Sequence, residues 1–322
     1  MEPTTRCNFT CGFCVGRHMH QLDLELSTSV RVFELFPNIE AIELQGEGEP
    51  LLNRDFFDIA DGAARLGAKI SLITNGSLMS PARVEQILKR PVERIGFSLE
   101  SPDDAKFEQI RGGSFPKVIE GIRRLKQARD TEGLKLPVIG LNVTVLKSTL
   151  DQLDSIVALY RELGLDGGIS FQGLQEMPSY SDCYSEQLTG EILSQNEKRT
   201  LGQFLVRFLS NATINKSGSN VGFYARLFAE LPTRPNTCPW LSKAGYVSAE
   251  GEMMPCCHIK NTEWSFGNVE ETDRETLIGR RDAMGSQLAN GIVPKPCVGC
   301  WVLPFLSQAF AHSSTEDRTN SR

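Results

Sequence analysis

The chain has 322 residues, of which 40% are hydrophobic and 23% are charged, and its formal net charge at pH 7 is −6. This length is enough for a sizeable core and suits one large domain with a smaller one. The acidic balance and the lack of a long basic run argue against nucleic acid as a partner. No apolar stretch approaches the roughly 20 residues of a membrane span, and the N-terminus lacks the features of a signal peptide. We therefore expect a soluble cytoplasmic protein.

Apolar strand-like runs alternate with amphipathic helical runs between about residues 39 and 174. This alternation is the pattern of repeated βα units around a parallel sheet. The predicted strands are 39–46, 69–76, 94–100, 137–146 and 168–174. The predicted helices are 27–36, 55–66, 81–88, 116–129 and 150–163. In such a fold the loops after the strands share one rim, where ligands bind.

A first strand should precede residue 7, but residues 1–6 (MEPTTR) are too few and too polar to form a normal one. We expect that the opening strand is truncated and that the natural chain starts upstream. Residues 185–232 show a helical pattern without strands. The following segment predicts a hairpin that turns near Glu250 and Gly251, and then a helix at 274–288.

Nine cysteines lie mostly toward the two ends of the chain. A reducing cytoplasm disfavours a disulfide framework and favours metal or redox chemistry for such a set. Cys183 stands alone and is interpreted as a small buried apolar residue. The N-terminal group is Cys7, Cys11 and Cys14, and the C-terminal group is Cys238, Cys256, Cys257, Cys297 and Cys300.

The N-terminal cysteines have the spacing C-x3-C-x2-C within one short loop. Three thiolates can bind three corners of an iron-sulfur cubane and leave the fourth iron open, as in catalytic rather than structural metal sites. The alternative is zinc, which needs a fourth ligand, and His18 and His20 are close in sequence. The βα units that follow favour the cluster.

This spacing, with the aromatic Phe13 before the third cysteine, resembles the signature of the radical S-adenosylmethionine (SAM) superfamily. The resemblance implies an α/β fold, a partial (β/α)6 TIM-like barrel over residues 1–184, with a [4Fe-4S] cluster that binds SAM at its open iron. It also implies a flavodoxin or ferredoxin-type reductant. Reductive cleavage of SAM would give methionine and a 5′-deoxyadenosyl radical that abstracts hydrogen from a substrate.

The loop after the first complete predicted strand resembles the family's GGEP motif, with Glu47 where the second glycine is usual. The resemblance implies that Gly46, Gly48, Glu49 and Pro50 present backbone groups and a carboxylate to the ammonium group of SAM. The alternative is a solvated acidic turn that ends in a proline. The position of the motif after a strand favours the binding function.

Further positions match residues that contact or orient SAM in relatives. An ordinary turn at residues 75–76, a helix-end cation at position 111 and β-propensity at position 144 are the alternatives. The matching residues are Thr74, Asn75, Ser98, Arg111 and Asn142, and Thr144 is predicted to face the barrel interior beside Asn142.

The C-terminal group begins with a C-x12-G-x4-C spacing from Cys238 to Cys256, followed by the turn Phe266-Gly-Asn268. This pattern resembles the opening of a SPASM domain. Because only Cys297 and Cys300 follow, the resemblance implies the shortened, twitch-type form, with these four cysteines around one auxiliary [4Fe-4S] cluster. A structural zinc site with the same four ligands is the alternative.

The implied organisation is a barrel over 1–184, a helical linker over 185–234, a small α+β iron-sulfur domain over 235–306 and a disordered tail over 307–322. Cys257 is a spare thiol, a substitute ligand or a hydrogen-atom donor, since neighbours on a hairpin point to opposite faces. His258 is interpreted as a surface residue, and His312 lies in the tail.

Three functions fit these observations. In the first, the auxiliary cluster accepts an electron from the substrate radical, which gives an oxidation, a dehydrogenation or a peptide crosslink. In the second, a cysteine thiol returns hydrogen and the enzyme is an epimerase. The third is a non-catalytic electron-transfer or scaffold protein. The implied substrates are small polar molecules or ribosomal peptides, and the lack of an N-terminal peptide-binding domain favours the former.

Overall fold

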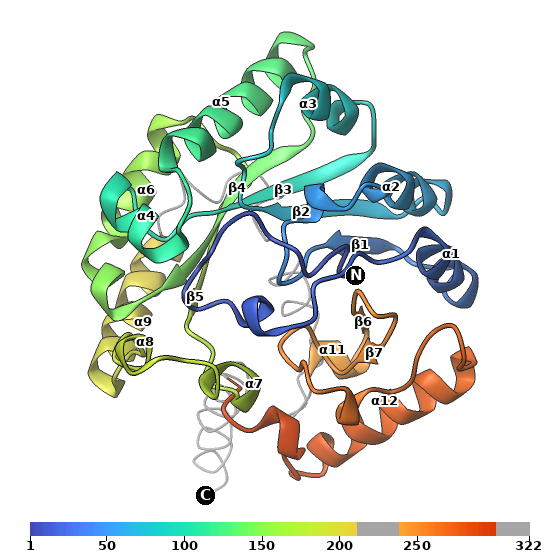
Figure 1. Ribbon diagram of the computed structural model, residues 1–322. Helices are drawn as coiled ribbons and strands as arrows, with labels where there is room; N and C mark the ends of the chain where they lie inside the picture. Colours follow the sequence, from blue (N-terminus) through green and yellow to red (C-terminus); the bar gives the residue numbers. More distant parts are fainter. Residues whose placement is uncertain (211–237, 301–322) are drawn as a thin grey trace, which may run out of the picture.

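The computed structural model describes residues 1–210 and 238–300. Its centre is a parallel sheet of five strands in the order β1-β2-β3-β4-β5, curled into a half-barrel with helices along its outer face (Figure 1). The strands are β1 (Ala41–Leu44), β2 (Lys69–Thr74), β3 (Val92–Ser98), β4 (Val138–Val145) and β5 (Ile169–Gly173). The partial TIM-like barrel is therefore confirmed, with five strands among the described residues.

The helices alternate with the strands along the chain. The helices bury apolar side chains against the sheet or against neighbouring helices, and buried residues such as Leu72, Ile95 and Phe97 form the core between the layers. The barrel helices are α1 (Leu26–Leu35), α2 (Phe56–Arg65), α3 (Pro81–Leu88), α4 (Asp104–Arg111), α5 (Phe115–Thr131) and α6 (Leu153–Glu162), with the short 3-10 helices η1 (Val15–His18), η2 (Pro50–Leu52) and η3 (Lys147–Gln152).

Helix α4 is the one barrel helix of the described residues that the apolar pattern did not predict. Its ends nevertheless carry the usual signals. Asp103 caps the first turn by accepting a hydrogen bond from the backbone N–H of Lys106 at 2.8 Å. Gly112 ends the helix in the left-handed region, at φ +62°. The helix is short and polar, so its amphipathic period is weak.

Residues 1–6 form no strand of this sheet. They are largely buried between the β1 edge and the C-terminal region: the N–H of Glu2 donates to the carbonyl of Val247 at 2.9 Å, and the N–H of Gln45 donates to the carbonyl of Met1 at 3.1 Å. Thr4 forms an isolated antiparallel bridge with Asp23. This segment therefore links the barrel to the C-terminal region.

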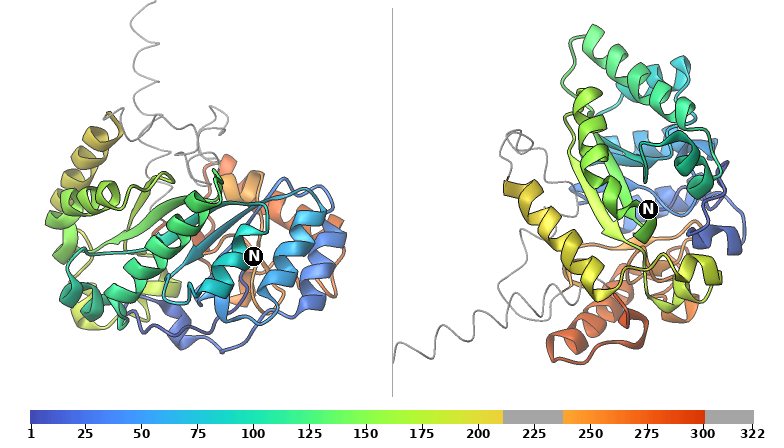
Figure 2. Two further views of the ribbon diagram at one scale, coloured as in Figure 1. Left: turned by 90° about the horizontal axis from the view of Figure 1, so that it is seen from above. Right: turned by 90° about the vertical axis from the view of Figure 1, so that its left-hand side faces the viewer.

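The C-terminal region lies beside the β1 edge of the sheet, on the side away from α5 (Figures 1 and 2). The predicted hairpin is present, and Gly251 takes a φ of +83° in its turn. The predicted Phe266-Gly-Asn268 turn packs against it, since the N–H of Phe266 donates to the carbonyl of Met253 at 2.8 Å. The elements are α11 (Pro239–Ser242), β6 (Tyr246–Val247), β7 (Met253–Met254), η4 (Thr262–Trp264), α12 (Arg274–Ala289) and η5 (Lys295–Cys297).

Between the two parts the described chain contains helices joined by short turns. The helices are α7 (Pro178–Ser181), α8 (Glu186–Thr189) and α9 (Gln195–Ser210). The rest of the predicted linker and the predicted disordered tail lie outside the described residues. Every helix of the described part is too short or too polar to cross a bilayer.

Candidate active site

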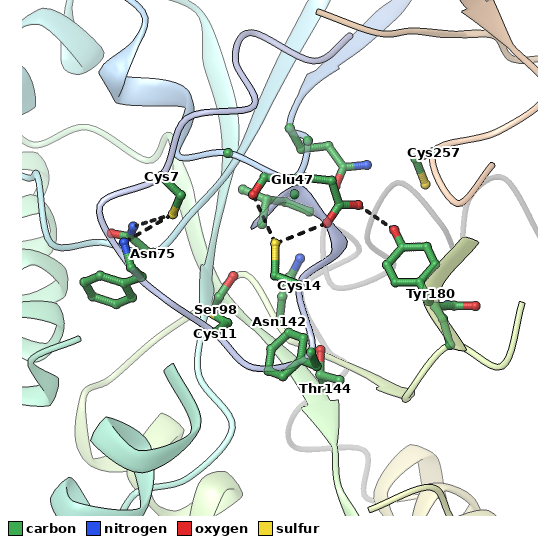
Figure 3. A pocket seen from close by; sticks show the side chains of 18 of the residues that line it. Cys7, Cys11, Cys14, Glu47, Asn75, Ser98, Asn142, Thr144, Tyr180 and Cys257 are labelled. Atoms are coloured by element: carbon green, nitrogen blue, oxygen red, sulfur yellow. Dashed lines mark hydrogen bonds between the residues drawn. The ribbon is translucent and has the colours of Figure 1, made fainter. Parts of the chain in front are cut away.

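A cavity of about 230 Å³ opens at the carboxyl ends of the barrel strands (Figure 3). Its wall combines the N-terminal cysteine loop, the loop after β1, the inner face of the sheet and the segment after Cys256. Pro50 begins η2 next to this wall and is buried. The predicted residues that line the cavity are Cys7, Cys11, Phe13, Cys14, Gly46, Gly48, Glu49, Thr74, Asn75, Ser98, Arg111, Asn142, Thr144 and Cys257.

The cysteine loop is held by the C-terminal end of α4. The N–H of Thr10 donates to the carbonyl of Arg111 at 2.9 Å, and the N–H of Gly12 donates to the carbonyl of Ile110 at 3.2 Å. A side chain at Gly112 would collide with Thr10, which explains why glycine ends the helix at this close approach. The helix that the sequence did not predict thus positions the thiols.

Each N-terminal thiol has a polar neighbour from a different part of the barrel. Asn75 Nδ2 lies 3.8 Å from the Cys7 sulfur, and Arg111 Nη1 lies 3.7 Å from the Cys11 sulfur. Burial raises the pKa of Cys11 to about 11, against the opposing influence of Arg111. The thiols are therefore protonated in the cluster-free protein, and metal binding would displace their protons.

Three sulfurs with N–H and guanidinium donors around one cavity are a suitable donor set for an anionic iron-sulfur cluster. His18 and His20 are exposed on the surface. Among residues 1–210 and 238–300, no three His, Cys, Asp or Glu side chains converge as on a single metal ion. A cubane takes one thiolate at each iron corner, so its ligands lie farther apart than those of one ion.

Arg111 is fixed by an ion pair with Glu100, whose side chain is fully buried. Arg111 Nη2 lies 2.6 Å from Glu100 Oε1, and Nε pairs with the other oxygen. The guanidinium also lies 5.6 Å from the centre of the Phe13 ring. This pair places a cation directly behind the cysteine loop.

Glu49 organises the loop after β2. Its carboxylate accepts hydrogen bonds from Thr74 Oγ1 at 2.8 Å, the N–H of Asn75 at 2.7 Å and the N–H of Leu51 at 3.2 Å. Burial raises the pKa of this carboxyl, although the three donors favour its ionised form. Both oxygens of Glu49 thus have protein partners, which fixes the loop after β2 against the loop after β1.

Glu47 forms a second buried network, which reaches the C-terminal region. Its Oε1 accepts from the Tyr180 hydroxyl at 2.5 Å and lies 2.9 Å from the Lys260 ammonium, while Oε2 lies 3.4 Å from the Cys14 sulfur (Figure 3). Burial opposes ionisation of Glu47, but Lys260 and the hydrogen bonds keep its pKa below the usual value. Burial also raises the pKa of Cys14, and the Glu47 carboxylate raises it further.

The inner face of the sheet closes the other side of the cavity. Asn142 on β4 and Ser98 on β3 are neighbours in the parallel register. The Asn142 side-chain oxygen accepts from Arg94 Nη2 at 3.2 Å, which fixes its amide. The prediction that Asn142 and Thr144 face the barrel interior is confirmed.

The C-terminal cysteines lie together around a small apolar cluster. Cys238, Cys256, Cys297 and Cys300 pack against a core that includes Trp240 and Tyr246. Burial raises the pKa of Cys238 to about 11 and that of Cys297 to about 12, and the neighbouring thiols of the group add to the shift. Each thiolate in this group would repel the others. The four thiols together therefore suit a metal centre with several cations, whose positive charge offsets that repulsion.

Cys257 and His258 follow Cys256 and turn toward the barrel. Cys257 is buried on the cavity wall (Figure 3). The interpretation of His258 as a surface residue is wrong, because packing of the hairpin against the barrel places it in the wall, with Nε2 3.5 Å from Gln175 Nε2. Burial and the Lys260 cation lower its pKa to about 4.

Cys183 is half-buried after α7 and lies within 3.9 Å of the Ser179 carbonyl, so its interpretation as a buried residue holds only in part. His312 is outside the described residues. Sequence reasoning missed Glu100, Tyr180 and Lys260. Lys260 carried a signal as a lysine close to the auxiliary cysteines, and Glu100 carried one as the last residue of the predicted strand 94–100, only 11 positions before Arg111. Tyr180 carried none, because its contact with Glu47 spans 133 positions of sequence.

Curated proteins of known activity resemble most of this chain. The tungsten-containing aldehyde ferredoxin oxidoreductase cofactor-modifying protein of Pyrococcus furiosus is 25% identical over 292 residues, which are 84% of this chain and 77% of that protein. The AdoMet-dependent heme synthase of Oleidesulfovibrio alaskensis is 24% identical over 292 residues, or 84% of this chain and 71% of that protein.

Solved structures share the fold. Streptococcus suis SuiB bound to S-adenosylmethionine superposes with a TM-score of 0.67 at 18% identity, over 94% of this chain and 72% of SuiB. Native anSMEcpe with bound AdoMet gives a TM-score of 0.66 at 15% identity, over 88% of this chain and 81% of that chain.

Two family models match the chain. The radical SAM superfamily model matches residues 1–166, and the SPASM iron-sulfur cluster-binding domain model matches residues 238–301. The cofactors of this class are SAM, its [4Fe-4S] cluster and an auxiliary iron-sulfur cluster. The chain thus belongs to the radical SAM superfamily and carries a C-terminal SPASM domain.

Proposed function

We propose that this enzyme abstracts a hydrogen atom from a substrate bound in the cavity and that the substrate radical is then oxidised. When bound, SAM and its [4Fe-4S] cluster supply a 5′-deoxyadenosyl radical, and the auxiliary cluster supplies an electron acceptor. The observation that carries this proposal is the shared cavity: the N-terminal cysteine loop and the segment directly after Cys256 line the same space.

Cys7, Cys11 and Cys14 would hold the first cluster. Asn75 and Arg111 place an amide and a cation beside two of these sulfurs, which supports negative charge on the thiolates. Because the loop is anchored to the end of α4, the thiols would be fixed before the cluster is reduced. Such fixed donors are the usual way in which a protein tunes an iron-sulfur centre.

SAM would lie across the carboxyl ends of β1 to β4. The backbone of Gly46 and Gly48 would face its ammonium group, with Glu49 fixing the adjoining loop through Thr74 and Asn75. A side chain at Gly48 would collide with the backbone of residues 4 and 6, so the loop there is closely packed. Ser98, Asn142 and Thr144 would complete the floor.

Cys238, Cys256, Cys297 and Cys300 would hold the auxiliary cluster as a [4Fe-4S] centre. Cys256 belongs to that group and Cys257 faces the cavity, so only one peptide bond separates a proposed ligand from the wall. The substrate would lie between the two centres. This arrangement favours loss of a second electron from the substrate, as in oxidation, dehydrogenation or peptide crosslinking.

Cys257 supports a second candidate function, a radical epimerase. A thiol on the cavity wall can return a hydrogen atom to the face of the substrate opposite the site of abstraction. The thiyl radical that this leaves on Cys257 would be reduced back to the thiol by one proton and one electron, which the flavodoxin or ferredoxin-type reductant would supply through the auxiliary cluster. The thiol would act in its protonated form, because the S–H group is the hydrogen-atom donor. The position of Cys257, buried and on the wall, favours this role over that of a spare surface thiol.

The proposed substrate is a small polar molecule or a ribosomal peptide. SuiB has been solved with its precursor peptide SuiA, and anSMEcpe with the Cp18Cys peptide. A flavodoxin or ferredoxin-type protein would supply the reducing electron.

The experiment is reductive SAM cleavage. Protein purified and reconstituted anaerobically, then reduced with dithionite, should convert SAM to 5′-deoxyadenosine. The matched control is the Cys7→Ala, Cys11→Ala and Cys14→Ala triple variant, which should produce none. If the reduced wild-type protein forms no 5′-deoxyadenosine under any condition, the chain is an electron-transfer or scaffold protein and the proposed function is wrong.

A further inference from the structure

The ion pair between Glu47 and Lys260 joins the loop after β1 (residues 45–49, the proposed SAM-binding loop) to the C-terminal SPASM domain (the auxiliary domain). Glu47 lies in the loop after β1, and Lys260 follows β7, so the pair spans more than 200 positions of sequence. Both side chains are largely buried, at 13% and 8% exposed. Removal of one partner of such a buried ion pair destabilises the protein, because the remaining charge is left buried without compensation.

Lys260 is also held in place by contacts other than the one with Glu47. Its ammonium lies 5.1 Å from the centre of the Tyr246 ring, and its backbone N–H donates to Ser179 Oγ at 3.4 Å. The Glu47 carboxylate raises the pKa of Lys260 far above its usual value in spite of burial. The side chain is therefore a fixed cation rather than a mobile surface lysine.

Glu47 connects Lys260 to the proposed site of the first cluster. Its backbone carbonyl and its Oε2 both lie 3.4 Å from the Cys14 sulfur. A carboxylate at that distance repels a thiolate, and the cation at its other oxygen reduces the repulsion. The carboxylate is anchored at Oε1 by Tyr180 and Lys260, so the loop cannot move away from Cys14 without breaking the pair.

The residue at position 47 departs from the glycine of the family motif, and a glycine would need no cation. We propose that Lys260 is a positioning residue: through Glu47 it holds the SAM-binding loop against Cys14, which makes the auxiliary domain a structural part of the SAM site. The inference rests on the proposed function, which assigns Cys14 to the cluster and the loop after β1 to SAM.

The test compares Lys260→Met with Lys243→Met, which removes an exposed lysine of the same domain. The readouts are the dissociation constant of SAM for the reconstituted protein and the change that SAM causes in the electron paramagnetic resonance (EPR) spectrum of the reduced first cluster. We expect Lys260→Met to bind SAM about tenfold more weakly and to lose most of the spectral change, because Glu47 is left unpaired. Lys243→Met should match the wild type.

Rescue separates positioning from general damage to the fold. The Glu47→Gly and Lys260→Met double variant should bind SAM within about threefold of Glu47→Gly alone, because without the carboxylate Lys260 has nothing to position. Lys260→Arg should retain the SAM affinity and the spectral change of the wild type. If Lys260→Met binds SAM as Lys243→Met does, or if it weakens SAM binding by as much in the Glu47→Gly background as in the wild type, the inference is wrong. If the wild type shows no SAM-induced change, the proposed function fails and the inference fails with it.

Discussion

Arg111 and Glu100 form a buried two-point ion pair directly behind the N-terminal cysteine loop. The carboxylate side chain is fully buried and the guanidinium is 9% exposed. Arg111 also reaches the Cys11 sulfur and covers the Phe13 ring. One side chain therefore connects the core of the barrel, the aromatic residue of the cysteine motif and a proposed cluster ligand.

Arg111→Leu should destabilise the cluster-free protein by about 3–5 kcal/mol, because it leaves Glu100 buried and unpaired. Urea denaturation measures the free energy of unfolding. The control is Lys89→Met, which breaks an exposed pair with Glu85 and should cost less than about 1 kcal/mol. Addition of Glu100→Leu to Arg111→Leu should recover part of the lost unfolding free energy. If Arg111→Leu and Lys89→Met lose the same amount, the prediction is contradicted.

Glu49→Gln should loosen the loop after β2. The carboxylate accepts from three donors, and an amide nitrogen in place of one oxygen would face a donor instead of accepting from it. We expect a loss of about 1–3 kcal/mol in unfolding free energy and weaker SAM binding. Glu34→Gln, at a side chain that is 61% exposed, is the control and should change neither quantity. Unchanged SAM affinity in Glu49→Gln would count against its anchoring role.

Cys297→Ser should remove the auxiliary cluster alone. Iron and sulfide assays on anaerobically reconstituted protein should fall from about eight irons per chain to about four, with the SAM-dependent spectral change of the first cluster retained. Cys183→Ser is the matched control and should keep both clusters. About four irons in the wild type, or one equivalent of zinc, would instead support the structural zinc alternative.

Cys257→Ala distinguishes the roles of that thiol. If Cys257 is a hydrogen donor, the variant should retain about eight irons and should still cleave SAM, but it should release no epimerised product. A loss of iron would make Cys257 a cluster ligand. Undiminished turnover of the identified substrate would leave the oxidation proposal and eliminate the thiol donor. Deuterium incorporation from D₂O into the product measures the donated hydrogen.

Glu43→Gln should stabilise the protein at neutral and higher pH. Burial raises the pKa of Glu43 to about 7 in the folded protein, partly opposed by Arg94. A raised carboxyl pKa contributes stability below about pH 4.5 that is lost as pH rises through 7, about 3 kcal/mol in total. The neutral glutamine keeps that contribution.

Thermal unfolding of the cluster-free protein at pH 5 and pH 8 tests this difference. The melting temperature of Glu43→Gln should exceed that of the wild type clearly at pH 8 and only slightly at pH 5. Glu40→Gln, on an exposed side chain three positions earlier, serves as the control. A gain that does not depend on pH would point to packing rather than to the carboxyl group.

Most elements of the barrel could be predicted from the sequence, because strand and helix periods are local properties of the chain. All five strands lie within the predicted ranges or differ from them by at most two residues at an end. Helix α4 was missed because its polar composition gives a weak amphipathic signal, although Asp103 and Gly112 mark its ends. The hairpin in the auxiliary domain followed from its turn residues.

The sequence by itself determined the family, through cysteine spacing and the motif after β1, because metal-ligand spacing within a loop is a short-range property. The tertiary structure alone decided which partners meet across the cavity. Glu100 meets Arg111, 11 positions later, only because α4 folds back toward the end of β3. Lys260 beside Glu47 and His258 in the cavity wall depend on how distant segments pack. No periodicity records such contacts, since a buried charge finds its partner only once the barrel and the auxiliary domain have come together.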